Sequence, residues 1–180
     1  MKNFKLMPFL AILCLVILFS ACNSKSGTDA AATKTTDTLK YLYRATYSSD
    51  VTVPSHPEYA QTVLKVWKMF ETKQIDSMKK YYADTVTYDA DGHRFHGKSD
   101  DLFKYAAKDI ENLDSLRFDI STWQSVHVND KNEDWVYIWA RERSYPKKGK
   151  PDTTMLHEQW KIEKGKVAYF NRYTAKPISK

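Results

Sequence analysis

Residues 116–174 read LRFDISTWQSVHVNDKNEDWVYIWARERSYPKKGKPDTTMLHEQWKIEKGKVAYFNRYT. Runs rich in β-branched and aromatic residues alternate here with short polar turns, a composition typical of β-strands. The four runs are 116–128, 135–145, 154–163 and 167–174. Because short connections join neighbouring antiparallel strands, the stretch predicts a four-stranded antiparallel meander.

The second of these runs is apolar on both of its faces. Alternate residues of a strand point to opposite faces, so one face carries Trp135, Tyr137 and Trp139, and the other carries Val136, Ile138 and Ala140. A sheet with one face in water should show polar residues on that face. We therefore expect helices to cover one face, and a partner, a ligand or the amino-terminal segment 39–54 to cover the other.

Helical patterns precede the meander. Ser55-His56-Pro57-Glu58 is typical of a capping box with proline in the first turn. Apolar residues then follow at helical spacing, namely Ala60, Val63, Leu64, Trp67 and Phe70. A shorter helix is expected to carry Ile75, Met78 and Tyr82, and a third, beginning at Ser99, to turn Leu102, Phe103, Ala106 and Ile110 inward.

A β-hairpin is expected between the second and third helices. Residues 85–88 are β-branched or aromatic, and residues 93–96 form the returning strand. Asp91-Gly92 between them is a strong signal for a type I′ turn, whose two central residues need positive φ. Helices grouped before an antiparallel sheet predict an α+β domain with its helices on one face.

The amino terminus has the features of a targeting signal. Lys2 and Lys5 precede an apolar run, 6–19, that is shorter than the ~20 residues a membrane-spanning helix needs. Phe19-Ser20-Ala21-Cys22 resembles the lipobox of bacterial lipoproteins, which implies cleavage after Ala21 and acylation of Cys22. An ordinary secretory signal or a short anchor helix is the alternative.

The resulting organisation has four parts. These are a signal peptide over 1–21, a tether over 22–38, an extra edge strand within 39–54 and a folded domain over 55–180. The tether is rich in Ser, Thr, Ala and Lys and is expected to be flexible. The lipobox implies a place in the bacterial cell envelope, lipid-anchored to a membrane, expected to be the outer membrane, and facing the periplasm or the surface.

Three short motifs resemble the NTF2-like superfamily, which includes SnoaL-like and ketosteroid-isomerase-like proteins. They are YYADTVT at 81–87, FHGK at 95–98, and GKV at 165–167 in a hairpin that ends at Tyr173. The resemblance covers about 55–174. It implies an α+β cone with three helices packed on a strongly curved antiparallel sheet, a pocket at the open end and often a dimer through the outer face of the sheet.

Several classes of site are excluded. None of the 5 Gly residues is spaced as G-x-G, which excludes dinucleotide and P-loop phosphate sites. Both Cys residues lie within the first 22 positions, and His93 and His96 point to opposite faces of a strand, so no metal and no cofactor are expected. The net charge of +6 comes from lysine-rich turns with interleaved acidic residues, so no nucleic-acid partner is expected.

Ligand sites need apolar walls with a few polar groups. The pocket is expected to be lined by Trp67, Tyr82, Phe95, Trp139, His157 and Tyr173. Arg141 and Arg172 are candidates for holding an anion.

Asp89 and His157 are the candidate catalytic residues, since acid–base chemistry needs a carboxylate or His whose pKa an apolar pocket shifts toward neutrality. In the isomerases that the chain resembles, a Tyr on the first helix and an Asp after the first strand do the work. Val66 and Trp67 occupy the first position here, and Ala90 matches the second best.

Three functions remain open. The leading one is a membrane-tethered NTF2-like lipoprotein that binds a small, partly apolar ligand in a conical pocket. The second is a SnoaL-like isomerase, cyclase or dehydratase that uses Asp89 or His157. The third is a structural or interaction module that forms a homodimer through its outer aromatic face. The expected partners are the bilayer, reached through Cys22, a small hydrophobic ligand and a second copy of the chain.

Overall fold

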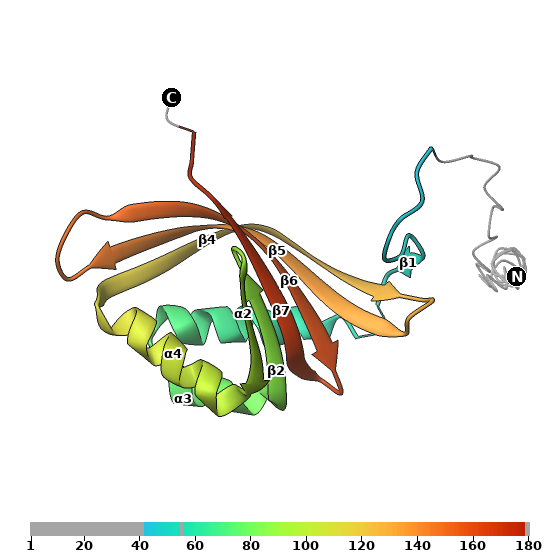
Figure 1. Cartoon of the computed structure of the whole chain (residues 1–180), viewed down its shortest axis with the longest axis horizontal. Helices are drawn as coiled ribbons and strands as arrows, with labels where there is room; N and C mark the ends of the chain where they lie inside the picture. The colour runs from blue at the N-terminus through green and yellow to red at the C-terminus, as the bar shows by residue number, and fades with distance from the viewer. Residues whose placement is uncertain (1–41, 55, 179–180) are drawn as a thin grey trace, which may run out of the picture. The chain divides into compact units, whose positions relative to one another are not determined.

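Seven strands form one sheet in the order β1-β4-β5-β6-β7-β2-β3 (Figure 1). The computed structural model describes residues 42–54 and 56–178. The strands are β1 (Val51–Thr52), β2 (Tyr82–Ala90), β3 (His93–Lys98), β4 (Leu113–Val128), β5 (Glu133–Pro146), β6 (Asp152–Glu163) and β7 (Lys166–Ala175). The helices are α2 (Glu58–Glu71), α3 (Ile75–Met78) and α4 (Ser99–Glu111), with a 3₁₀ turn, η2, at Lys79–Tyr81.

The predicted meander is confirmed. Strands β4, β5, β6 and β7 pair in chain order, each antiparallel to the next. Register shifts interrupt the pairing between Ile120 and Thr122 in β4, and between Lys161 and Ile162 in β6. Such irregularities bend a strand and increase its twist, and the sheet curves over α2, α3 and α4, which lie together on its concave side (Figure 1).

The β2–β3 hairpin forms at the predicted turn. Asp91 has a φ of 46° and Gly92 a φ of 89°, as a type I′ turn requires. Strand β2 also pairs with β7, and this pair is parallel, unlike every other pair in the sheet. Tyr82 was expected on the second helix; it is instead the first residue of β2, because the short helix ends in the 3₁₀ turn.

Gly92→Val tests this turn. A β-branched residue at positive φ strains the backbone, so we expect the free energy of unfolding to fall by about 1–2 kcal/mol, measured by urea denaturation. A Cβ at this position would contact nothing within 4 Å, so the loss would not come from a steric clash. Gly92→Asn is the matched control, because Asn tolerates positive φ, and it should lose less. Equal losses for the two variants would contradict this reading of the turn.

The aliphatic face of β5 meets the helices. Val136, Ile138 and Ala140 are buried in one cluster with Val63 and Trp67 of α2. The first helix begins at Glu58, with Pro57 before it and no side-chain capping hydrogen bond, and Ser55 lies outside the described residues. The third helix buries Leu102, Phe103 and Ile110 as predicted.

The aromatic face of β5 points away from the helices, and within residues 42–54 and 56–178 it is covered at one end. There the amino-terminal segment packs against the sheet: the ring of Tyr47 meets Trp135 edge-on, with centroids 6.1 Å apart, and its hydroxyl donates to Glu133. The Asn129 amide donates to the Asp50 carboxylate at 2.8 Å, and β1 pairs with the end of β4. At the other end of this face Trp139 is 37% exposed and Tyr173 is 53% exposed.

The described helices include none that is both long and apolar enough to cross a membrane. Residues 1–22, on which the signal-peptide and lipobox expectations rest, lie outside the described part of the chain.

Candidate functional site

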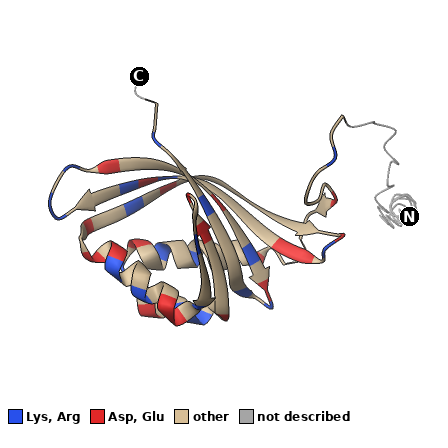
Figure 2. Cartoon of the chain, viewed as in Figure 1, with Lys and Arg blue, Asp and Glu red and all other residues tan. Residues whose placement is uncertain are grey.

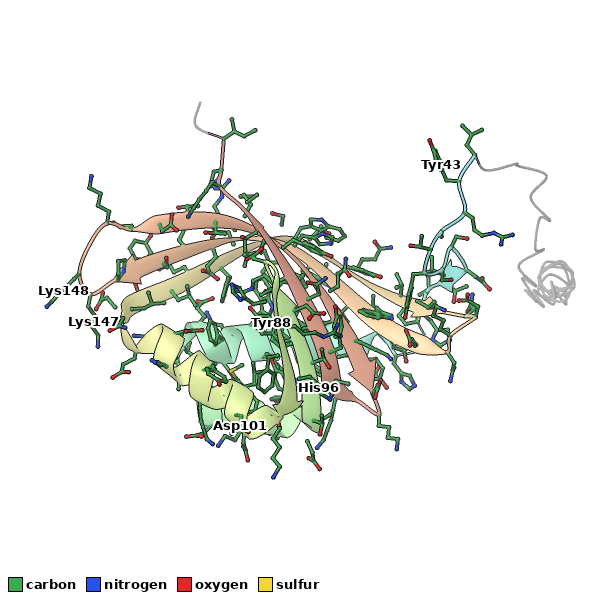
Figure 3. The ribbon with its side chains drawn as sticks, in the orientation of Figure 1. Tyr43, Tyr88, His96, Asp101, Lys147 and Lys148 are labelled. Atoms are coloured by element: carbon green, nitrogen blue, oxygen red, sulfur yellow. The ribbon has the colours of Figure 1, made fainter. Side chains whose placement is uncertain are left out.

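A cavity of about 510 Å³ lies between the inner face of the sheet and helices α2 and α4. Most of its wall is apolar. Helices α2 and α4 contribute Val66, Trp67, Phe70, Leu102, Phe103 and Ala106. Aromatic side chains from the strands complete the wall, namely Tyr82, Tyr88, Phe95, Phe118, Trp160 and Phe170. Tyr88 lies in the interior between the sheet and the helices (Figure 3).

Exposed polar residues mark the open end of this cavity. They are His93 and Arg94, at the start of β3, and Tyr105 and Asp109 on α4. The Arg94 guanidinium forms an ion pair with Asp89 at 3.4 Å. Ligands would therefore enter past a rim that carries both signs of charge.

An ion cluster lies beside the cavity, where Arg172 of β7 and the rim residue His93 of β3 pair with the same residue of β2, Ala90. Glu158 of β6 is 0% exposed, and its two carboxylate oxygens accept hydrogen bonds from Arg172 Nε at 2.6 Å and Trp160 Nε1 at 2.9 Å. Arg172 Nη1 also lies 3.6 Å from a carboxylate oxygen of Glu142 on β5. The Arg172 side chain is 24% exposed and lines the cavity, so it is the charged group that a ligand meets there.

Burial and charge fix the protonation of Arg172 and of the two tyrosines near it. Burial alone would lower the pKa of Arg172, but the carboxylates of Glu158 and Glu142 raise it above its ordinary value. Burial raises the pKa of Tyr82 and of Tyr88, and the charge of Glu158 adds to both effects. The guanidinium is therefore always charged and both phenols are neutral, so all three groups are hydrogen-bond donors.

Glu142 makes stability depend on pH. Burial raises its pKa above the ordinary value near 4.5, and Arg172 only partly opposes that rise. The native state then holds this proton more tightly than the unfolded state does, so the contribution of Glu142 to stability falls as pH rises from the ordinary pKa through the raised one.

Glu142→Gln removes that titration. We expect its stability relative to the wild type to improve steadily as pH is raised from 4 to 7, measured by urea denaturation at each pH. Glu111→Gln, at the exposed end of α4, is the control and should show no such trend. A difference between Glu142→Gln and the wild type that does not change with pH would argue against a raised pKa.

Of the six residues expected to line the pocket, the structure brings three together. Trp67, Tyr82 and Phe95 line the cavity. Trp139, His157 and Tyr173 lie on the outer face of the sheet, where the Trp139 and His157 rings stack with centroids 4.6 Å apart. They do not reach the cavity because successive residues of a strand point to opposite faces, and the neighbours of these three residues face the helices.

The two candidate catalytic residues also lie outside the cavity. Asp89 follows the cavity residue Tyr88 on β2, so it points to the outer face and accepts a hydrogen bond from the Tyr169 hydroxyl at 3.0 Å. Burial, together with Asp89, raises the pKa of Tyr169 to about 12. His157 is on the same outer face, and its Nε2 is buried without a hydrogen-bond partner among the described residues.

Sequence reasoning missed Glu142 and Tyr88. A signal for Glu142 was present, since it continues the alternation of Val136, Ile138 and Ala140 onto the buried face. A charged residue whose side chain points to a buried face needs a partner. Here the partner is Arg172, which the sequence had indicated only as a residue that could hold an anion.

The described residues contain no group of three or more His, Cys, Asp or Glu side chains that could hold a metal ion. His93 lies at the open end of the cavity, while His96 Nδ1 is 2.8 Å from the Thr87 hydroxyl. Lys and Arg residues are interspersed with Asp and Glu over the helices and the sheet (Figure 2). The lysines of the β5–β6 turn, Lys147 and Lys148 among them, are exposed (Figure 3).

No protein-family model matches the chain, and no curated protein matches its sequence significantly. Solved structures do resemble it. An LEH-like epoxide hydrolase from M. tuberculosis superposes with a TM-score of 0.57 at 10% identity, covering 68% of this chain and 86% of that one. A putative SnoaL-like polyketide cyclase from Shewanella putrefaciens gives 0.55 at 9% identity, covering 67% and 81%. An NTF2-like protein of unknown function from Exiguobacterium gives 0.55 at 14%, covering 63% and 98%.

These identities are low, so the likeness concerns the fold. The described part of the chain contains an α+β cone of the NTF2-like kind, with three helices on a curved, open sheet that is mostly antiparallel.

Proposed function

We propose that this NTF2-like domain binds a small, partly apolar molecule in the cavity between the sheet and helices α2 and α4. The observation that supports the proposal is the cavity itself: about 510 Å³, walled by apolar and aromatic side chains, with the partly exposed Arg172 guanidinium on its wall. Sites for small ligands typically enclose about 300–1,000 Å³ and combine apolar walls with a few polar groups.

Tryptophan fluorescence tests this proposal, because Trp67 and Trp160 both line the cavity. We expect 2-acetylnaphthalene, an uncharged bicyclic compound, to quench the fluorescence saturably, and calorimetry to give one site per chain. Weak, unsaturable quenching by this and other uncharged bicyclic compounds, or a crystal structure in which side chains fill the cavity, would refute the proposal.

We further propose that the domain is tethered to a membrane through lipid on Cys22. The lipobox and the polar tether supply the argument, and more than one acyl chain is needed for a stable anchor. The location proposed is the bacterial cell envelope, expected at the outer membrane, facing the periplasm or the surface. Radiolabelled palmitate should enter the protein and its Cys14→Ala variant but not Cys22→Ala; labelling of Cys22→Ala would overturn the proposal.

A catalytic role is the second candidate. Two of the similar structures carry the names of an epoxide hydrolase and a polyketide cyclase. In this chain the observation that favours chemistry is the Arg172 guanidinium on the cavity wall, which lies 3.6 Å from Glu142, a carboxyl group of raised pKa. Asp89 and His157 do not reach the cavity. Recovery of a bound ligand with its mass unchanged after long incubation supports binding alone, whereas turnover that Glu142→Gln abolishes would establish an enzyme.

A homodimer through the outer face is the third candidate. The supporting observation is the aromatic strip of Trp139, His157 and Tyr173 that the amino-terminal segment leaves open. Exposed apolar patches often mark protein interfaces. Sedimentation over a dilution series should show a dimer that Trp139→Ser weakens; a monomer at every concentration would contradict this candidate.

A further inference from the structure

The free polar groups around Arg172 on the cavity wall are hydrogen-bond donors. Arg172 Nε donates a hydrogen bond to Glu158, while Nη1 and Nη2 make no hydrogen bond to another described residue. Among the described residues, the buried side-chain nitrogen and oxygen atoms without a hydrogen-bond partner are Arg143 Nε and His157 Nε2. Nη1 and Nη2 of Arg172 are therefore accessible rather than buried. The hydroxyls of Tyr82 and Tyr88 also have no hydrogen-bond partner among the described residues, and neither oxygen is fully buried.

The acceptors beside Arg172 offer no free oxygen inside the cavity, since those of Glu158 are engaged and Glu142 is not among the residues that line it. Both carboxylate oxygens of Glu158 hold donors, from Arg172 and Trp160, and the residue is fully buried. A ligand that entered with a hydrogen-bond donor would therefore find no free carboxylate of Glu158 to accept it. A ligand that entered with an acceptor would find up to three donors.

The charges around the cavity disfavour an anion. Arg172 faces Glu158 and Glu142, and at the open end Arg94 is paired with Asp89 while Asp109 lies on the same rim. Carboxylates thus outnumber guanidinium groups, and a carboxylate ligand would add one more negative charge. An ammonium ligand would instead have to approach the Arg172 guanidinium, which repels it.

We infer that the ligand presents a neutral oxygen acceptor, a carbonyl of the ketone, ester or amide type, to Arg172, Tyr82 and Tyr88. The apolar remainder of the ligand lies against the aromatic wall. This inference rests on the proposed function and names the chemical class of ligand for that same cavity.

The test compares three compounds of similar size by calorimetry: 2-acetylnaphthalene, 2-ethylnaphthalene and 2-naphthoate. The affinity ratio of the ketone to the hydrocarbon is measured in the wild type and in the double variant Glu158→Leu/Arg172→Met, which removes the ion pair as a unit. The free compounds are hydrated identically in the experiments with the wild type and with the double variant. The change in the affinity ratio between the two proteins therefore reports the hydrogen bonds to the ketone. We expect the ratio to fall about tenfold in the double variant, since bonds to charged donors are strong.

Single hydroxyl deletions supply a second readout that does not disturb the ion pair. Tyr82→Phe should lower the same ratio about threefold, whereas Tyr169→Phe, which removes a phenol on the outer face, should leave it unchanged. Glu142→Gln should improve the affinity for 2-naphthoate relative to the ketone, because one repelling carboxylate is lost.

The outcomes separate the two claims. If none of the three compounds binds, the proposed function fails and the inference fails with it. If they bind but the ratio is the same in the wild type, the double variant and Tyr82→Phe, the cavity binds apolar molecules and the inferred carbonyl class is wrong. Tighter binding of 2-naphthoate than of the ketone by the wild type would also overturn the inference.

Discussion

Replacing Arg172 by Met is expected to lower the free energy of unfolding by about 3–5 kcal/mol, the largest loss we predict for a single substitution. The reason is Glu158, which is 0% exposed and would keep a buried negative charge with only the Trp160 indole as a partner. Urea denaturation of the purified variant gives the measurement. The loss should exceed that of Arg141→Met, an exposed arginine on the outer face.

The double variant Glu158→Leu/Arg172→Met is the control for this prediction. Removing both charges leaves no fully buried ion, because Glu142, which also loses its partner, is partly exposed, and apolar replacement of a buried pair is often neutral or stabilising. The double variant should therefore regain most of the stability that Arg172→Met loses. If Arg172→Met unfolds no more easily than Arg141→Met, the ion cluster is not the buried element described above.

The second prediction concerns the space in the cavity. Ala106 of α4 lines the wall, so Ala106→Trp places an indole where a ligand would lie. We expect the affinity for 2-acetylnaphthalene to fall at least tenfold, or ~1.4 kcal/mol of binding free energy, measured by calorimetry. Urea denaturation should show that the variant remains folded.

Ala107→Trp provides the matched control on the same helix. Ala107 is exposed and does not line the cavity, so the added ring should leave the affinity unchanged. If both variants bind like the wild type, the ligand occupies another part of the molecule.

Much of the fold could be predicted from local sequence. The four runs of the meander and the Asp91-Gly92 turn carry their own signals, because alternation and positive-φ turn residues act over a few positions. The helix that begins at Ser99 was also visible from its apolar spacing. The parallel pairing of β2 with β7 was not visible, because it joins segments far apart in the chain.

Which face of the sheet would meet the helices could not be decided from β5 alone. Both faces of that strand are apolar at its start, so Trp139 was assigned to the pocket, although the aliphatic face of Val136 and Ile138 is the one that packs against α2. Glu142 lies on the helix-facing side, because it continues the alternation of Val136, Ile138 and Ala140, and it pairs with Arg172 there.

The Glu158–Arg172 pair depends on a register shift that the sequence does not reveal. Glu163 pairs with Lys166 next to the β6–β7 turn, and an uninterrupted ladder from there would place Glu158 opposite Asn171. The irregularity between Lys161 and Ile162 moves the register by one residue, so Arg172 lies opposite Glu158 instead. A single residue of slip therefore decides whether the guanidinium reaches the buried carboxylate.

A crystal structure of the protein with 2-acetylnaphthalene tests the central claim most directly. The account predicts one molecule inside the cavity, with its naphthalene ring against Trp67 and Phe103 and its ketone oxygen within hydrogen-bond distance of Arg172 or Tyr82. Density for the compound only on the outer face, beside Trp139 and Tyr173, would contradict it.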